Sequence, residues 1–338
     1  MIRKIVIILV IMPALVTGLF ACSGSETSGE VNSVVVVSPH PVDFMRPLIN
    51  EFETQTGITV KIIECGTSEA ISRIQAGEAI DVLWGGSVLS VGPFEDSFAE
   101  YRSANYDAFS EEFKKMPGTV TCFTDVPSVL MVNTDLIGDI KIEGYEDLLD
   151  PRLTGKIAYA NPKRSSSSFE HLVNMLYAMG DGDPEAGWDY AGKFAYQLDG
   201  NLLKGSSEVY KGVANGKFVV GLTFEEAAIT QMRAGKHVKI VYMKEGVVST
   251  PDGLYIAGNA TNLENARKFV DFMTDKDTQK YISADLGRRS VRCDVEESAL
   301  VSPKEEINII EVDGDTVTAR KAEWSEKFAM LCGEGDDE

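Results

Sequence analysis

The alternation of apolar and amphipathic segments over residues 34–86 limits the possible folds more than any other feature of the sequence. The valine run at 34–37 suits a strand buried on both faces, and a helix is expected over 42–56. A strand at 58–63, a helix at 66–75 and a strand at 81–84 follow, closed by Gly85 and Gly86. This β-α-β-α-β order predicts a parallel sheet with helices on both faces.

The rest of the chain continues in the same style, without an internal repeat of fixed period. Strands are expected at 129–133, 156–160, 218–223, 239–242 and 253–257. Helices are expected at 165–179, 188–198, 208–215, 262–274, 276–286 and 316–331. The length is sufficient for two domains of ordinary size, so we predict an α/β protein of more than one lobe.

The N-terminus indicates export. Arg3 and Lys4 precede an uncharged stretch that ends near Ala21, and this run is shorter than the roughly 20 residues of a membrane span. The Cys directly after Ala21 resembles the lipidation site of a bacterial lipoprotein. We therefore predict a signal peptide over 1–21, lipid on Cys22, and a small, polar, flexible tether over 22–33. The expected location is outside the cell membrane, periplasmic or at the cell surface, and held there by lipid.

Charge and cysteine content narrow the function. The net charge of −20 argues against nucleic acid and anionic lipid as partners, because the long-range field would repel both. Four cysteines follow Cys22, and they allow up to two disulfides in an oxidising compartment. They are Cys65, Cys122, Cys293 and Cys332. We favour a bridge between Cys293 and Cys332, and the spacings do not suit a zinc site.

Three predicted helices begin with hydroxyl side chains and glycine. Unpaired backbone N–H groups and the positive end of the helix dipole make such starts suitable for anions. Capping alone explains any single start better, since Ser and Thr are preferred N-caps. Four consecutive serines, with Lys163 and Arg164 just upstream, exceed what a cap needs. The candidate ligand-binding residues at these starts are Gly66, Thr67, Ser68, Ser165, Ser166, Ser167, Ser168, Ser206 and Ser207.

Other candidates follow the predicted strands, where ligands of open α/β sheets bind. These are Ser38, His40, Trp84, Gly85, Gly86, Ser128, Glu225 and Glu226, to which we add Tyr210. His40 suits a surface loop and a ligand contact about equally. Trp84 and Tyr210 could lie against a sugar ring or belong to the core. His171 and His237 are expected to be structural or solvated.

No motif of a known catalytic constellation is present, so we expect a protein that is not an enzyme. The sequence lacks a nucleophile elbow, a P-loop, a zinc-protease helix and a Cys placed with a His. Adjacent residues on an extended segment point apart, which disfavours acid–base work by Glu225 and Glu226. A membrane-tethered phosphatase-like hydrolase remains the alternative from another class.

Several motifs together resemble the extracellular solute-binding proteins of ABC importers, in the branch of ferric-iron, hexose-phosphate and phosphonate binders. The resemblance rests on the lipoprotein start and on VVVVSP, DVLWGG, PRLTGKI, SSSS, GSSEVYK, VGLTFEE and LGRRSVR. It implies a type II-like fold of two lobes, each with a mainly parallel sheet flanked by helices, joined by a hinge. Lobe one would take residues 34–124 and 254–300, lobe two 125–253, and 301–338 would pack on the lobes.

The same resemblance implies the partners and bears on the ligand. The partners would be a small-molecule ligand, an ABC permease and its ATPase; the protein would be a monomer without a cofactor. Ferric-binding members carry adjacent tyrosines where this chain has Phe224, Glu225 and Glu226. We therefore expect an organophosphate first, its anionic group on the serines and its other half on Glu225 or Glu226. Fe(III), held by His40, Glu225 and Glu226, comes second, and a polyamine third.

Overall fold

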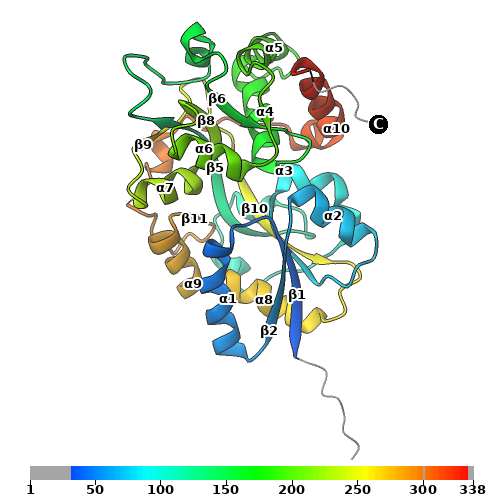
Figure 1. Cartoon of the computed structure of the whole chain (residues 1–338). Coiled ribbons are helices and arrows are strands. Elements are labelled where there is room, and N and C mark those ends of the chain that lie inside the picture. The colour runs from blue at the N-terminus through cyan, green and yellow to red at the C-terminus, as the bar shows by residue number, and fades with distance from the viewer. Residues whose placement is uncertain (1–31, 300, 334–338) are drawn as a thin grey trace, which may run out of the picture. The chain divides into compact units, whose positions relative to one another are not determined.

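The computed structural model of the protein describes residues 32–299 and 301–333 (Figure 1). The predicted signal peptide, Cys22 and most of the predicted tether lie outside these described residues. Strand β1 (Ser33–Ser38) begins within the expected tether. No helix in the described ranges is both long and apolar enough to cross a membrane.

The first lobe contains the β-α-β-α-β unit that the N-terminal alternation predicts. Helix α1 (Val42–Thr56) follows β1, and Gly57 ends it in the left-handed conformation that glycine adopts without strain. Strand β2 (Thr59–Glu64), helix α2 (Thr67–Gln75) and strand β3 (Val82–Ser87) complete the unit. Both β2 and β3 pair in parallel with β1, as expected for strands joined by helices.

Two long antiparallel strands, β5 (Thr121–Asn133) and β10 (Ser249–Ala257), run from one lobe into the other (Figure 1). In the first lobe β10 pairs with β3 and with β4 (Phe98–Ala99), and β5 pairs with β11 (Arg289–Ser290). In the second lobe β5 pairs with β8 (Val220–Phe224) and β9 (Val238–Val241). The expected lobe borders after Thr124 and after Gly253 fall inside these two strands, which the lobes share.

The second lobe adds parallel strands β6 (Ile157–Ala160) and β7 (Leu202–Leu203) beside β8. Its helices are α4 (Ser166–Met179), α5 (Trp188–Gln197), α6 (Ser206–Ala214) and α7 (Glu225–Arg233). The parallel pairs thus belong to the strands that helices connect, and the antiparallel pairs involve the crossing strands β5 and β10. This is the two-lobe α/β fold that the sequence predicts.

The C-terminal third returns first to one lobe and then to the other. Helices α8 (Leu263–Met273) and α9 (Lys276–Tyr281) and a π-helical turn (Ile282–Leu286) join the first lobe, where Phe269 packs on Phe52 with ring centroids 5.3 Å apart. Helix α10 (Gly314–Leu331) packs on the second lobe. Phe328 of α10 is fully buried, with its ring centroid 5.4 Å from that of Tyr159 on β6.

The preferred disulfide prediction is wrong. Cys293 is an exposed free thiol beside the first lobe, where its backbone N–H donates to the carbonyl of Ala108 at 2.9 Å. Cys332 follows α10 and packs against the core of the second lobe. Cys65 and Cys122 are also free thiols, so neither forms a bridge. Both favoured cysteines lie near the C-terminus, but the chain crosses between the lobes in the interval that separates them.

We predict that Phe328→Ala lowers the free energy of unfolding by about 3–5 kcal/mol, the usual cost of emptying a buried phenylalanine site. Urea denaturation measures this loss. Met330→Ala in the same helix is the matched control, because Met330 is 57% exposed and a surface change costs within about 0.5 kcal/mol. Equal stabilities of the two variants would show that α10 does not pack on the second lobe.

Candidate ligand-binding cleft

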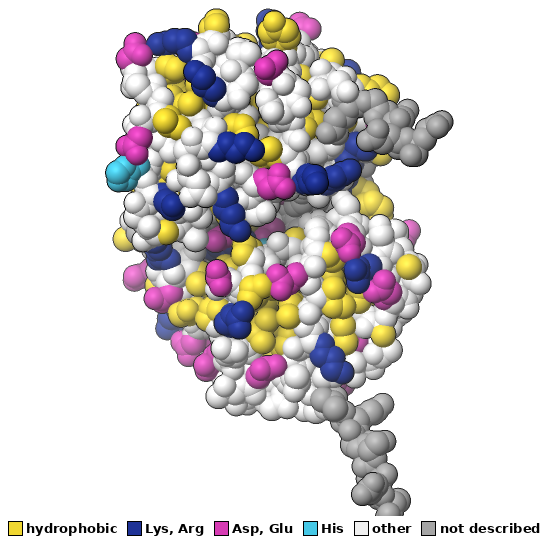
Figure 2. Space-filling model, viewed as in Figure 1, with side chains coloured by type: hydrophobic (Ala, Val, Ile, Leu, Met, Phe, Trp, Pro, Cys, Tyr) yellow, Lys and Arg dark blue, Asp and Glu magenta, His cyan; other side chains and the backbone are white. Residues whose placement is uncertain are grey.

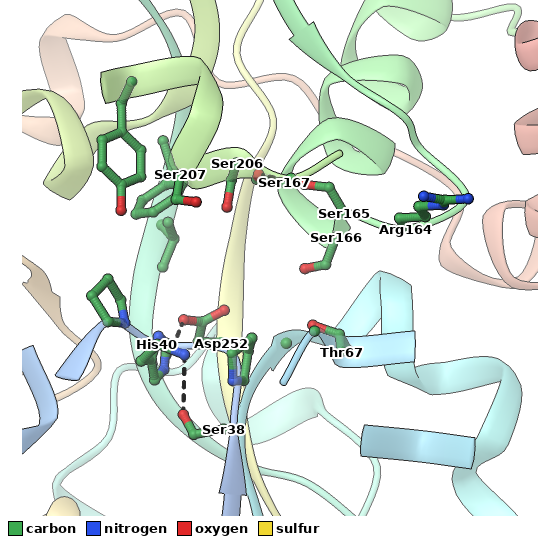
Figure 3. Close-up of a pocket in the computed structure, with 18 of the residues that line it drawn as sticks. Ser38, His40, Thr67, Arg164, Ser165, Ser166, Ser167, Ser206, Ser207 and Asp252 are labelled. Carbon is green, nitrogen blue, oxygen red and sulfur yellow. Dashed lines mark hydrogen bonds and ion pairs between the residues drawn. The ribbon is translucent and has the colours of Figure 1, made fainter. Parts of the chain in front are cut away.

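A cleft of about 720 Å³ lies between the two lobes and is lined by residues of both. Figure 3 shows hydroxyl side chains reaching into it from opposite sides. Ser166, Ser167, Ser206 and Ser207 come from the second lobe, and Thr67 comes from the first. Ser38 also lines the first-lobe side, but its hydroxyl donates to the carbonyl of Trp84 at 2.6 Å. Figure 2 shows the hollow between the lobes in the space-filling view. Donors on both walls would make a ligand a bridge between the lobes.

Three helix N-termini open onto this cleft, those of α2, α4 and α6. The N-caps of α2 and α6 are Gly66 and Gly205, and no side chain caps either helix. The first backbone N–H groups of both helices therefore lack both an intrahelical partner and a capping side chain. All three starts contribute lining residues. Their dipoles place partial positive charge at the cleft, which favours an anion there.

The four serines divide their work between capping the helix and lining the cleft. Ser165 is the N-cap of α4, and its hydroxyl accepts from the backbone N–H of Ser168 at 3.4 Å. The Ser165 Oγ also lies 3.2 Å from the Oγ of Ser167 and from that of Ser168. Ser166 and Ser167 are partly exposed and line the cleft. One serine is thus enough for capping, and its neighbours remain available to a ligand.

A buried arginine network forms the floor of the cleft. Arg288 Nη1 lies 2.6 Å from Asp252 Oδ2, and its Nη2 lies 3.2 Å from Glu226 Oε2. Arg288 is only 3% exposed. Burial raises the pKa of Asp252, and Arg288 opposes that rise. The arginine therefore holds carboxylates that would otherwise face a ligand.

His40 lies beside this network and is neutral. Burial, followed by the charge of Arg288, lowers the pKa of His40 well below its usual value. Its Nδ1 lies 3.4 Å from Arg288 Nη2 and must accept there, because a guanidinium only donates. The proton of the neutral ring then belongs on Nε2, which is buried and lies 3.6 Å from Asp252 Oδ2. The His40 ring thus lies between Arg288 and Asp252 and belongs to the buried network.

The two glycines after β3 position neighbouring side chains. Gly85 and Gly86 have φ values of +111° and +87°, which residues with a Cβ rarely adopt. A Cβ on Gly85 would come within 2.6 Å of His40 Nε2, and one on Gly86 within 2.7 Å of Thr67 Cγ2. Of these two glycines, only Gly86 lines the cleft. The sequence predicts that they let a ligand approach the backbone closely, but in the structure they make room for the side chains of His40 and Thr67.

The exposed charges of the cleft are of both signs, and the cations lie on the second lobe. The exposed carboxylates in the lining are Asp43, Glu64 and Glu208. Arg164, Lys204 and Lys211 are exposed and line the cleft, and none of them pairs with a carboxylate among the described residues. Lys and Arg side chains gather on the second lobe near the hollow (Figure 2). The upstream neighbour Lys163 instead pairs with Glu326 of α10 at 2.6 Å. These three cations lie on the same lobe as the N-termini of α4 and α6, which makes the second-lobe wall attractive to anions.

The structure brings most of the predicted site residues to the cleft. The residues that line it are Ser38, His40, Gly66, Thr67, Gly86, Ser128, Ser165, Ser166, Ser167, Ser206, Ser207 and Tyr210. The predicted residues that do not line it are Ser68, Trp84, Gly85, Ser168, Glu225 and Glu226. The reasons for these departures differ.

Trp84 belongs to the core of the first lobe. It is fully buried, and its ring lies 5.7 Å from that of Phe123 and 5.5 Å from that of Phe269. Stacking of Trp84 on a sugar ring is therefore wrong. Tyr210 lines the cleft near Phe224, with ring centroids 6.3 Å apart.

Glu225 and Glu226 bind arginines instead of facing a ligand. They start α7 and are 2% and 6% exposed. Glu225 Oε1 lies 2.9 Å from Arg289 Nη2, and Glu226 pairs with Arg288. The prediction that either carboxylate accepts hydrogen bonds from the ligand is wrong in this arrangement, because their oxygens are already engaged.

Ser68 and Ser168 make internal contacts. Ser68 is exposed at the mouth, and its hydroxyl donates to the carbonyl of Lys163 in the other lobe at 3.3 Å. Ser168 is 1% exposed, and Tyr159 donates to its carbonyl at 2.5 Å. Ser68 thus links the lobes, and Ser168 ties α4 to β6.

Sequence reasoning did not predict the nine charged residues of the cleft lining: Asp43, Glu64, Arg164, Glu170, Lys204, Glu208, Lys211, Asp252 and Arg288. Arg164 was noted only as an upstream cation. The adjacent pair Arg288 and Arg289 follows the helix-ending Gly287 and matches the adjacent carboxylates at 225 and 226. That complementarity was the available indication for Arg288. The position of Glu170 in the middle of an apolar helix face was the available indication for that residue.

We predict that Arg289→Met makes stability depend on pH through Glu225. Burial already raises the pKa of Glu225, and Arg289 is the main group opposing that rise. Without the cation the folded-state pKa rises further above the unfolded value of about 4.3. The folded state then binds more protons than the unfolded state, so stability falls as pH rises from that value toward the raised pKa.

Urea denaturation of Arg289→Met at pH 5.5, 6.5 and 7.5 measures this fall, which is limited to about 1.4 kcal/mol per pH unit. Arg289→Met/Glu225→Gln is the control and should lose the additional pH dependence. The explanation fails if the single variant loses the same stability at every pH.

The sequence matches the family model described as bacterial extracellular solute-binding protein over residues 47–308. Two relatives illustrate the range of the family. Iron uptake protein A1 of Synechocystis is 22% identical over 77% of this chain and 76% of its own length. A putative 2-aminoethylphosphonate-binding periplasmic protein of Salmonella typhimurium is 24% identical over 72% of this chain and 73% of its own.

Solved structures share the fold. The periplasmic binding protein AfuA from Actinobacillus pleuropneumoniae, with fructose-6-phosphate bound, superposes with a TM-score of 0.82 at 21% identity, covering 90% of this chain and 99% of that one. A structure described as a two-component system protein mediating signal transduction has 32% identity and a TM-score of 0.74, covering 83% and 94%. With the family match spanning more than half of its length, this chain belongs to the bacterial extracellular solute-binding proteins, the binding components of ABC importers.

Proposed function

We propose that this solute-binding protein captures an organophosphate, either a sugar phosphate or a phosphonate, in the cleft between its lobes. The observation that carries the proposal is the meeting of three helix N-termini, two of them without a side-chain cap, beside cations that form no ion pair with any described residue. A phosphate group has three strong acceptor oxygens and nearly two negative charges near neutral pH. It would accept hydrogen bonds both from the backbone N–H groups at these helix N-termini and from the serine hydroxyls beside them.

The phosphate group would lie at the second-lobe wall. Ser166, Ser167, Ser206 and Ser207 supply hydroxyl donors there. Arg164 and Lys204 add charge at the rim. Hydrogen bonds to a charged group are roughly twice as strong as neutral ones, so this wall would provide most of the affinity.

The organic half of the ligand would face the first lobe. Thr67 of the first lobe and Tyr210 of α6 in the second lobe line the cleft with neutral hydroxyls, and the neutral His40 also lines it. Burial raises the pKa of Tyr210 to about 12, so its phenol is neutral at physiological pH. Sugar hydroxyls both donate and accept, which suits these neutral groups. These neutral groups, rather than Glu225 and Glu226, would bind the organic half of the ligand.

Fe(III) is the alternative, favoured by the iron uptake relative. The cleft offers it little: the described residues contain no group of three or more His, Cys, Asp or Glu side chains placed to hold a metal ion. His40 would have to give up its contact with Arg288, and Asp252 and Glu226 are paired with the same arginine. A cation would meet this arginine at the cleft floor, so the anion fits better.

The remaining steps follow from membership of the family. Ligand would stabilise the closed lobes, because donors on both walls engage only when the lobes meet. The closed monomer would then dock on its permease, which an ATPase drives. Lipid on Cys22 would keep it at the membrane. We propose that the protein has no turnover of its own, and steady release of nitrophenol from nitrophenyl phosphate would contradict this.

A thermal-shift panel tests the ligand class. Fructose 6-phosphate, 2-aminoethylphosphonate, Fe(III) and spermidine are compared on the full mature chain. A ligand at 100 times its dissociation constant adds about 2.7 kcal/mol of stability, which is readily seen. We expect a shift with a phosphate or phosphonate ester. A shift with Fe(III) alone, together with colour, would replace the organophosphate with iron.

Ser166→Ala/Ser167→Ala tests the serine wall. We expect an affinity loss of 100-fold or more for the phosphate ester, since each hydrogen bond to a charged group contributes about 1.5–3 kcal/mol. The unliganded stability should change little, because Ser165 rather than these two caps the helix. Titration calorimetry and urea denaturation measure the two effects. Ser72→Ala, an exposed serine of α2 bonded to the carbonyl of Ser68, is the control. Equal losses of stability and affinity would return the serines to a structural role.

A further inference from the structure

A buried carboxyl lies in the same wall of the cleft as the serines. Glu170 is in the second turn of α4, is 6% exposed and lines the cleft. Ser166, four residues earlier in the same helix, and Ser87 at the end of β3 in the first lobe lie near this carboxyl, and their hydroxyls oppose the rise of its pKa. An anion held by Ser166 and Ser167 would therefore lie next to this carboxyl.

A lysine from the C-terminal helix lies behind the carboxyl. Lys321 of α10 donates to the carbonyl of Ser90 in the first lobe. Its ammonium lies 5.6 Å from the ring centroid of Phe94 and 5.4 Å from that of Phe169, which suits a cation. Lys321 and Glu170 interact electrostatically. The pair thus sits where α4, α10 and the first lobe meet.

We propose that Glu170 and Lys321 form a proton-linked specificity element, and that the cleft binds a doubly charged phosphate group only while this pair holds two protons. The inference rests on the proposed organophosphate function. An ionised carboxylate beside the serines would repel the phosphate, whereas a protonated one is neutral and can donate to it. With Lys321 charged, the doubly protonated pair carries one positive charge.

The environment of the pair sets the pH at which it changes. Burial raises the pKa of Glu170 to about 8, against the opposing effect of the Ser87 and Ser166 hydroxyls. Burial lowers the pKa of Lys321 to about 8. The other ionisable groups that face Glu170 are Asp252 and Tyr255 of β10. Asp252 favours the protonated carboxyl, and the pKa of Tyr255 is raised well above its usual value, so the tyrosine stays neutral.

These protonation states determine how the affinity for phosphate changes with pH. Below pH 8 the pair holds both protons, and phosphate binds without proton uptake. Above pH 8 both groups lose protons, the net charge of the pair falls toward −1, and binding must restore the protons. The affinity should then fall by up to about tenfold per pH unit for each proton restored. A phosphate ester has its second pKa near 6, so its own charge is constant above pH 7.5.

The test uses fructose 6-phosphate and titration calorimetry between pH 7.5 and 9.5. We expect the affinity of the wild-type protein to fall above pH 8, with uptake of more than one proton at pH 9, measured from the binding heats in two buffers of different ionisation enthalpy. Glu170→Gln/Lys321→Met removes both ionisable groups and should bind with a nearly flat pH profile. Glu51→Gln/Lys268→Met, an exposed pair with the same charge change, should keep the wild-type slope.

The outcomes separate the inference from the function on which it rests. A wild-type protein that binds the ester equally at all pH values, without proton uptake, overturns the inference and leaves the function standing. The wild-type slope in the Glu170→Gln/Lys321→Met variant overturns it as well. No binding of any phosphate or phosphonate at any pH overturns both. If the double variant does not fold, the proton uptake of the wild-type protein decides.

Discussion

A buried network of arginines and carboxylates joins the two lobes, and the polarity of the cleft depends on it. Arg288 and Arg289 follow the last helix of the first lobe, whereas Glu225 and Glu226 begin α7 of the second. Each of the four side chains is less than 9% exposed. Removing one partner of such a pair strands a buried charge, which typically costs about 3–5 kcal/mol. The network therefore fixes which residues of the two lobes can meet.

The network also explains how an acidic protein can present an anion site. Asp252 and Glu226 would give the cleft floor negative charge, but Arg288 binds both. The two floor carboxylates are thereby neutralised, while the rim cations Arg164, Lys204 and Lys211 form no ion pair in the described part of the chain. The field inside a cleft depends on groups within a few ångströms, because solvent ions screen the rest beyond about 8 Å. The net charge of −20 therefore does not decide the ligand.

The sequence predicted the features that depend on neighbouring residues. The β-α-β-α-β unit and the three helix starts follow from local periodicity and from glycine and serine at fixed positions, so twelve of the predicted residues reach the cleft. The pairing of Glu225 with Arg289 joins residues 64 positions apart, and no local pattern encodes it. Trp84 shows the same limit. A residue at the end of a strand can point to the core or to the cleft, and the bulky neighbours Phe123 and Phe269 that decide this come from distant segments.

Contacts between the lobes on opposite sides of the cleft have different chemistry, and this difference bears on closure. On one side the arginine network is fully paired without a ligand. On the other, single hydrogen bonds join the lobes: Ser68 donates to the carbonyl of Lys163, and Lys321 donates to that of Ser90. A single hydrogen bond separates more easily than a buried ion network. Opening would then start on the side of the serine wall, where the proposed phosphate lies, and a bound anion would hold closed the part of the cleft that opens first.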